Sequence, residues 1–222
     1  MSKHVFLTGP PGIGKTTLIR KVTQALKSTG VPIDGFYTEE VREDGRRTGF
    51  DVVALSGKRG PLSRVSSDSS TSRRECRVGQ YIVDVVSFEQ LVLPLLRNVN
   101  LGSDAEKKIC VIDEIGKMEL FSQSFIQAVR QMLTGSGTVI LGTIPIPKGK
   151  PLDLVEEIRS RKDVKVFNRY SWGRGNGECL PENNTVSWCL GCAHSKAIVC
   201  VWSPQGRKQS TGKQHLAFQG SF

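Results

Sequence analysis

The sequence has no long apolar run. Its richest apolar stretch, Leu91–Leu96, contains Pro94 and is far shorter than the roughly 20 residues that a membrane-spanning helix requires. The run Val5–Leu7, which precedes Gly9, is also too short for the apolar part of an export signal. We therefore expect a protein that is not secreted and does not span a membrane, located in the cytoplasm or nucleus.

Cysteine and acidic residues are also scarce. Six cysteines in 222 residues, without an export signal, indicate reduced thiols rather than a disulfide framework. Basic residues outnumber acidic ones by 31 to 21, and a net charge of +10 raises nucleic acid as a partner. However, these residues are scattered, with short local excesses only at Arg42–Arg47, Arg73–Arg77 and Lys148–Lys150. A solvated surface that attracts polyphosphate explains this pattern at least as well, so we expect a nucleotide partner and no nucleic acid.

Hydrophobic periodicity divides the chain at Asn168. Residues 1–168 alternate strand and helix patterns, which predicts an α/β domain with a mixed, mostly parallel sheet between helices. Residues 169–222 lose this periodicity and hold all three tryptophans and four of the six cysteines. We predict a poorly ordered, irregular C-terminal tail over 169–222. The expected strands are His4–Thr8, Gly35–Val41, Thr48–Leu55, Tyr81–Val86, Lys108–Ile112, Thr138–Ile144 and Val164–Phe167, and the expected helices are Lys15–Ser28, Phe88–Arg97, Phe121–Leu133 and Pro151–Arg161.

Three local signals refine this prediction. Asp44-Gly45 lies between two β-rich runs and predicts a single antiparallel hairpin, because glycine accepts the positive φ of such turns. The polar, serine-rich segment Ser63–Arg74 predicts a mobile loop. Ser87 and Gln90 resemble a capping box that would open a helix at Phe88.

The first chemical motif lies between a predicted strand and a predicted helix. Gly9-Pro10-Pro11-Gly12-Ile13-Gly14-Lys15-Thr16 fits the pattern G-x-x-x-x-G-K-[ST] at every position. Its glycines let backbone N–H groups point at phosphate oxygens, and the helix directs its positive dipole end at the same anion. Lys15 would reach the β- and γ-phosphates, and the Thr16 hydroxyl would ligate Mg²⁺. The motif predicts a nucleoside-triphosphate site.

A second motif follows about one hundred residues later. The apolar run Ile109-Cys110-Val111-Ile112 ends in Asp113-Glu114, which brings two carboxylates to a sheet edge. Asp113 would hold Mg²⁺, directly or through water, and Glu114 would accept a proton from water in line with the γ-phosphate. By itself such a pair also fits an ordinary strand end, but the P-loop favours catalysis. Lys15 and Glu114 are thus the predicted catalytic residues, with Thr16 and Asp113 as metal ligands.

Other candidates carry less weight. Thr143, at a strand end, fits either a contact with the γ-phosphate or a structural role. Several cations fit either transition-state stabilisation or a solvated surface, and position does not choose among them. They are Lys117, Lys148, Lys150, Arg159 and Arg161.

The tail contains one C-x-x-C pair, Cys189 and Cys192, with Cys179, His194 and Cys200 nearby. A structural zinc site requires four ligands and typically spaces two such pairs. We therefore expect the tail to bind no structural zinc.

Residues 1–168 resemble the family of small P-loop enzymes that comprises the cancer-related nucleoside-triphosphatase and its relatives in thermophiles. The resemblance implies hydrolysis of ATP, GTP and other nucleoside triphosphates with loose base preference, nucleotide binding at Gly9–Thr16 and Ile109–Gly116, and a monomer. The chain departs from that family after Asn168, where its tail resembles an alternative ending. The matching segments are Gly9–Thr16, Gly35–Glu40, Gly49–Asp51, Ile112–Glu119 and Leu141–Pro145.

Two other functions share the P-loop. A small-molecule kinase would present an acceptor hydroxyl to the γ-phosphate, and its usual arginine-rich lid has only a thin counterpart in Arg159–Lys162. A nucleotide-dependent binding module for nucleic acid or protein would use hydrolysis as a timer. Glu114 next to Asp113 favours water as the acceptor, and release of phosphate without acceptor or partner would separate the three.

Overall fold

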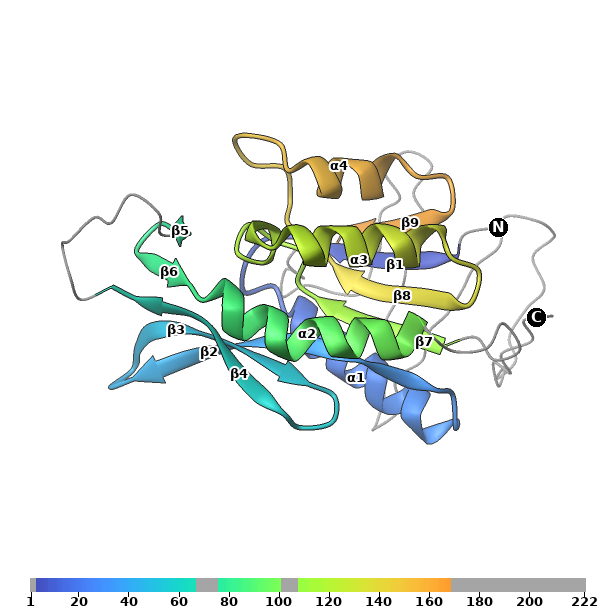
Figure 1. The fold of residues 1–222 in the computed structure, drawn as a ribbon, viewed down its shortest axis with the longest axis horizontal. Helices are drawn as coiled ribbons and strands as arrows, with labels where there is room; N and C mark the ends of the chain where they lie inside the picture. The colour runs from blue at the N-terminus through green and yellow to red at the C-terminus, as the bar shows by residue number, and fades with distance from the viewer. Residues whose placement is uncertain (1–2, 67–75, 101–107, 169–222) are drawn as a thin grey trace, which may run out of the picture. The chain divides into compact units, whose positions relative to one another are not determined.

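The computed structural model describes residues 3–66, 76–100 and 108–168, and the fold below refers to these residues. Nine strands form one sheet in the order β5-β6-β4-β3-β2-β7-β8-β1-β9 (Figure 1). The strands are β1 (His4–Thr8), β2 (Ile33–Glu43), β3 (Arg46–Ala54), β4 (Arg59–Val65), β5 (Arg77–Val78), β6 (Tyr81–Val83), β7 (Lys108–Asp113), β8 (Thr138–Thr143) and β9 (Val164–Asn168).

The strands β2, β7, β8, β1 and β9 form the parallel half of the sheet. Parallel strands are covered on both faces and therefore read as continuous apolar runs, as the sequence of β7 does. Tyr37 is in register with Asp113, and Leu7 with Thr143. The carboxyl ends of β2, β7, β8 and β1 therefore meet at one edge, with β8 between the other two strands that carry site residues, β1 and β7.

The antiparallel half is larger than the single hairpin that the sequence predicts. Asp44 and Gly45 make the expected turn between β2 and β3, with φ of 47° and 77°. Beyond β3, strands β4, β6 and β5 continue the sheet. The prediction of a mobile loop over Ser63–Arg74 is wrong at its start, because Ser63 belongs to β4 and is buried. Burial against neighbouring elements overrides the poor strand propensity of this polar sequence.

Helices cover both faces (Figure 1). On one face α1 (Lys15–Ser28) packs Ile19 against Val111 and Leu141. On the other face α2 (Val85–Asn100), α3 (Gln123–Thr134) and α4 (Asp153–Ser160) contribute to the main core. The core includes edge-to-face contacts among three fully buried rings, each of which gains about 1.5–3 kcal/mol from burial. The rings are those of Phe36, Phe88 and Phe125.

The helix starts follow capping chemistry. Ser122 accepts a hydrogen bond from the backbone N–H of Phe125 at 2.9 Å and caps α3. The predicted capping box of Ser87 is wrong, because α2 begins earlier. Asp84 is the residue that accepts from the backbone N–H of Ser87, at 2.9 Å. A carboxylate at this position also suits the positive end of the helix dipole.

The predicted fold class, an α/β P-loop fold with a mixed sheet between helices, is confirmed. The described elements all lie within the unit Met1–Ser171. The predicted tail, 169–222, and its cysteines lie outside the described residues. None of the described helices combines the length and the apolar character that crossing a membrane requires.

Candidate active site

The loop between β1 and α1 places the P-loop at the carboxyl edge of the sheet. Gly12 and Gly14 have φ of 76° and 84°, in the left-handed region where a side chain is strained. Gly14 is the N-cap of α1, so the first N–H groups of the helix open toward this loop. Lys15 Nζ donates to the carbonyl oxygens of Gly9, at 3.0 Å, and Pro10, at 3.4 Å. The ammonium group of Lys15 thus bonds back to the first two residues of the motif.

Asp113, at the end of β7, is buried at 1% exposure. The Thr143 hydroxyl donates to its Oδ1, while Oδ2 is buried without a hydrogen-bond partner. Burial raises the pKa of Asp113, and this shift is opposed by the hydrogen bond from Thr143, by the nearby Thr16 hydroxyl and by the charges of Lys15 and Arg20. Residues of α1, among them Lys15 and Thr16, therefore lie close enough to the end of β7 to affect the Asp113 carboxyl.

Glu114 lies beside Lys15, with 3.7 Å between Oε2 and Nζ. About a third of the Glu114 side chain (32%) is exposed, so water reaches it. Burial of the rest raises the pKa of its carboxyl, the Lys15 ammonium lowers it, and Asp113 raises it again. A carboxylate with a raised pKa and access to water is suited to accept a proton.

A second buried carboxyl lies next to Glu114. Glu119, in the short helix η1 (Glu119–Phe121), is 4% exposed and accepts from the backbone N–H of Gly116 at 3.0 Å. A Cβ on Gly116 would lie 2.8 Å from Glu114 Oε1 and 3.1 Å from Glu119 Oε2, so only glycine lets both carboxyls approach this point. Burial and the charge of Glu114 raise the pKa of Glu119 to about 8. Glu119 is therefore largely protonated at neutral pH.

The structure does not bring every predicted nucleotide-binding residue to the P-loop. Ile109, Cys110, Val111 and Ile112 pack within the two hydrophobic clusters of the sheet. Asp113 and Glu114 are the members of this segment whose side chains lie near Lys15. Ile115 donates its backbone N–H to Thr143 at 2.9 Å and has a buried side chain, so it fixes the strand ends.

The structure separates the predicted cations. Arg161 pairs with Asp163 and donates to the Leu133 carbonyl oxygen, at the amino-terminal ends of the strands and away from the P-loop. Arg159 donates to Thr8 Oγ1 at 3.0 Å and to the Pro145 carbonyl oxygen, and Thr8 is the residue that directly precedes the P-loop.

The three lysines lie elsewhere. Lys117 lines a separate groove of about 410 Å³ with Phe121 and Leu152. Lys148 and Lys150 are exposed in the loop that follows β8.

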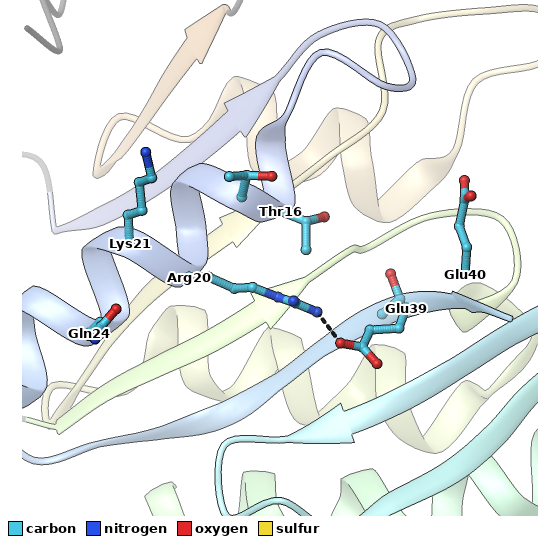
Figure 2. Close-up of a pocket in the computed structure, with 8 residues that line it drawn as sticks. Thr16, Arg20, Lys21, Gln24, Glu39 and Glu40 are labelled. Carbon is cyan, nitrogen blue, oxygen red and sulfur yellow. Dashed lines mark hydrogen bonds and ion pairs between the residues drawn. The ribbon is translucent and has the colours of Figure 1, made fainter. Parts of the chain in front are cut away.

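A groove of about 520 Å³ lies between α1 and β2, directly beside Thr16 (Figure 2). Arg20 reaches across it from α1 and pairs with Glu39 of β2. Its guanidinium carbon also lies 3.9 Å from the centre of the Tyr37 ring. The groove is lined by Thr16, Thr17, Arg20, Lys21, Gln24, Thr38, Glu39 and Glu40.

Sequence reasoning did not single out Arg20 or Glu119. Helical spacing offers a signal for Arg20, since it follows Thr16 by four residues and lies on the same face of α1. Glu119 carries no comparable signal, because a glutamate in a polar segment is usually exposed and its burial depends on the fold of the loop.

A P-loop that opens a helix, an acidic pair at the end of a parallel strand, and a strand inserted between them define a P-loop NTPase. The comparisons agree with this class. The profile of the protein family described as NTPase matches residues 4–175, and the chain belongs to this family.

The chain is similar to proteins from humans and from a hyperthermophilic bacterium. The human cancer-related nucleoside-triphosphatase is 72% identical over 168 residues, which cover 76% of this chain and 88% of the human one. A solution structure of the human protein superposes with a TM-score of 0.67 over 75% of this chain and 88% of that chain. A crystal structure of THEP1 from Aquifex aeolicus gives 0.63 at 36% identity, over 75% and 89% of the two chains. The predicted enzyme class, a nucleoside-triphosphatase, is confirmed.

Proposed function

We propose that this chain hydrolyses ATP, GTP and other nucleoside triphosphates to the diphosphate and phosphate, in a site built by Gly9–Thr16, Asp113 and Glu114. The observation that carries the proposal is the convergence of Lys15 and Glu114, 3.7 Å apart at the mouth of the P-loop. The names of its relatives, nucleoside-triphosphatases, support the same activity.

The P-loop would bind the triphosphate. Its backbone N–H groups and the first turn of α1 provide donors and a positive dipole end. The Lys15 ammonium, now bound to the carbonyls of Gly9 and Pro10, would turn to the β- and γ-phosphate oxygens, which are stronger acceptors. The resulting charge neutralisation lowers the barrier to transfer of the terminal phosphate.

The residues at the end of β7 fit a magnesium ion. Asp113 Oδ2 is a buried oxygen without a hydrogen-bond partner, and the Thr16 hydroxyl lies close enough to Asp113 to lower its pKa. Mg²⁺ prefers such oxygen ligands and retains several waters. Thr16 and Asp113 would hold the ion, which would supply positive charge to the β- and γ-phosphates.

Glu114 would orient the attacking water. The water oxygen forms the new bond to the γ-phosphorus, and the bond from that phosphorus to the bridging oxygen of the diphosphate breaks. The water proton passes to the Glu114 carboxylate. The Lys15 ammonium opposes the rise that burial causes in the Glu114 pKa, and so favours the ionised carboxylate.

We further propose a cytoplasmic or nuclear monomer without a nucleic-acid partner. Scattered basic residues support the absence of a nucleic-acid partner, the expected reduced thiols support the compartment, and the family resemblance supports the monomer. Light scattering of the purified chain, with and without added duplex DNA or RNA, tests the monomer and the absence of nucleic-acid binding, and imaging of the tagged chain in cells tests the compartment.

Phosphate release from the purified chain, measured across the common nucleoside triphosphates with and without Mg²⁺, tests the proposed hydrolysis. We expect magnesium-dependent release without any acceptor, at similar rates for different bases. Lys15→Ala should abolish it while circular dichroism remains unchanged, since the Lys15 side chain contacts the carbonyls of the loop and Glu114 and is not part of the hydrophobic core. Normal turnover by folded Lys15→Ala would refute the site, and release only with an acceptor alcohol would favour a kinase.

A further inference from the structure

We propose that Arg20 is a catalytic cation of this site. Its guanidinium breaks the ion pair with Glu39 and contacts the terminal phosphate in the transition state. This inference rests on the proposed hydrolysis and assigns one more residue to it. It supplies from within the chain the positive charge that many P-loop enzymes obtain from an arginine finger.

The position of Arg20 follows from two elements. On α1 it lies one turn after Thr16 and on the same face. On the sheet, its guanidinium carbon lies 3.9 Å from the centre of the Tyr37 ring, and Tyr37 is in register with Asp113. The guanidinium therefore lies at the level of the acidic strand end.

Its ion-pair partner, Glu39, lies beyond Tyr37 along β2, past the position that is in register with Asp113. Glu39 follows Tyr37 by two residues on β2 and therefore projects from the same face of the sheet. Figure 2 shows the Arg20 side chain extended from α1 toward Glu39, with Thr16 beside it. Arg20 and Thr16, the proposed Mg²⁺ ligand, line the same groove.

Arg20 has both the room and the freedom to move. Its side chain is 43% exposed and borders the groove of about 520 Å³ that Thr16 also lines. A partly exposed ion pair and a single contact with an aromatic ring are each weak, so the loss of the contacts with Glu39 and Tyr37 opposes the movement only weakly. The charge that develops on a transferred phosphoryl group is a stronger attractant in a partly enclosed site.

Glu39 does not lose its counter-ion when Arg20 leaves. The Arg59 guanidinium pairs with the other Glu39 oxygen and with Asp51. Arg59 would therefore neutralise Glu39 throughout the cycle. The five groups Arg20, Glu39, Arg59, Asp51 and Arg64 form one continuous chain of ion pairs.

Other described cations are less suited. Arg161 is at the amino-terminal ends of the strands, and Lys117 lines a different groove. Arg159 is fixed by Thr8 and by the Pro145 carbonyl, with a buried Nε that has no hydrogen-bond partner. Arg20 lines the same groove as Thr16, and its two contacts, with Glu39 and with the Tyr37 ring, are weak and exchangeable.

Arg20→Ala and Arg20→Lys test the inference against a matched control. Arg47 makes the same two kinds of contact, an ion pair with Glu40 and a position over the Phe50 ring, at 5.4 Å, but does not line the groove. We expect Arg20→Ala to lower kcat by about 10²-fold or more with little change in KM, and Arg20→Lys to recover part of it. Arg47→Ala should keep the kcat of the wild type.

Two further measurements separate catalysis from structure. Affinity for a nucleoside diphosphate with aluminium fluoride, a mimic of the transferred phosphate, should fall in Arg20→Ala while affinity for the diphosphate alone is kept. Glu39→Gln, which weakens the hold on Arg20, should keep or raise kcat. Equal loss of kcat in Glu39→Gln and Arg20→Ala would show that the ion pair matters for structure, and would overturn the inference.

Failure of the inference is distinct from failure of the proposed function. A wild-type protein that releases phosphate at the same rate as folded Arg20→Ala would overturn the role of Arg20 and leave the hydrolysis standing. A wild-type protein that releases no phosphate, or whose release is insensitive to Lys15→Ala, would refute the hydrolytic site and the inference with it.

Discussion

The hydroxyl of Thr143 donates a hydrogen bond to Oδ1 of Asp113 and leaves Oδ2 buried without a partner. This contact joins the ends of two strands that are 30 residues apart in the sequence. A buried polar atom without a partner is rare and is explained here by the proposed metal ligand role.

Thr143→Val tests this relationship, because valine keeps the shape of threonine and removes its hydroxyl. Loss of an orienting hydrogen bond to a metal ligand typically costs about 10–100-fold in metal affinity or activity. We expect a higher Mg²⁺ concentration for half-maximal phosphate release, and Thr143→Ser should restore the wild-type value. An unchanged Mg²⁺ dependence in folded Thr143→Val would show that Thr143 has only a structural role.

Glu114→Gln and Asp113→Asn should separate the two acidic roles. Glu114→Gln removes the proton acceptor and should slow hydrolysis by roughly 10²-fold or more while nucleotide binding is kept. Asp113→Asn should instead raise the Mg²⁺ requirement. Equilibrium binding of a labelled nucleotide, measured with phosphate release at several Mg²⁺ concentrations, distinguishes them. Poor binding with normal turnover in Glu114→Gln would require the two roles to be exchanged.

Glu119 should make the fold less stable as the pH rises. Its pKa is about 8 in the folded chain, against an ordinary value of 4.5, so the folded state binds more protons between these values. The contribution of Glu119 to the free energy of unfolding is complete below pH 4.5 and is lost as the pH rises through about 8. In Glu119→Gln, a neutral amide replaces the protonated carboxyl and removes this loss. Urea unfolding between about pH 6 and about pH 9 should therefore show a flatter pH dependence than in the wild type.

The same substitution at the exposed Glu43 is the matched control for this comparison. Wild-type and Glu119→Gln proteins that lose stability in parallel above neutral pH would contradict the burial of a protonated Glu119.

His4, in contrast to Glu119, should make the fold less stable as the pH falls. Burial, together with the nearby charges of Lys3 and Arg161, lowers its pKa from 6.5 to about 4, although Asp163 opposes this shift. The unfolded chain therefore binds more protons between these values, and stability falls as the pH drops through this window. Acidification from about pH 7.5 to about pH 5 should lower the free energy of unfolding by on the order of 2 kcal/mol through His4. His4→Gln should be less stable at neutral pH but should lose less on acidification, which thermal unfolding at both pH values measures.

An equal loss on acidification in the wild type and in His4→Gln would assign acid sensitivity to other groups. The His4 ring accepts the backbone N–H of Ile140 at 3.1 Å, so a stability difference at neutral pH is expected and does not decide the question.

Several features could be predicted from the sequence because they depend on neighbouring residues. The P-loop motif specifies its own conformation through Gly12 and Gly14, and the turn at Asp44-Gly45 follows from the same preference for positive φ. Apolar periodicity located α1 and the buried strands β7 and β8 within one or two residues. The strand β4 could not be predicted, because its burial depends on partners elsewhere in the fold. The start of α2 was misplaced although the residue that accepts from its first turn, Asp84, is a neighbour in the sequence.

Thus the sequence by itself determined the class of fold, the phosphate loop, and the acidic pair Asp113-Glu114, all of which are encoded in short contiguous segments. Only the tertiary structure decided that β8 lies between β1 and β7, and hence that Thr143 contacts Asp113. It likewise decided that Glu119 is buried beside Glu114, and that Arg20 is held over Tyr37 at the edge of the site. The physical reason is that strand order and side-chain burial are set by the packing of segments distant in sequence, whose local patterns are compatible with more than one arrangement.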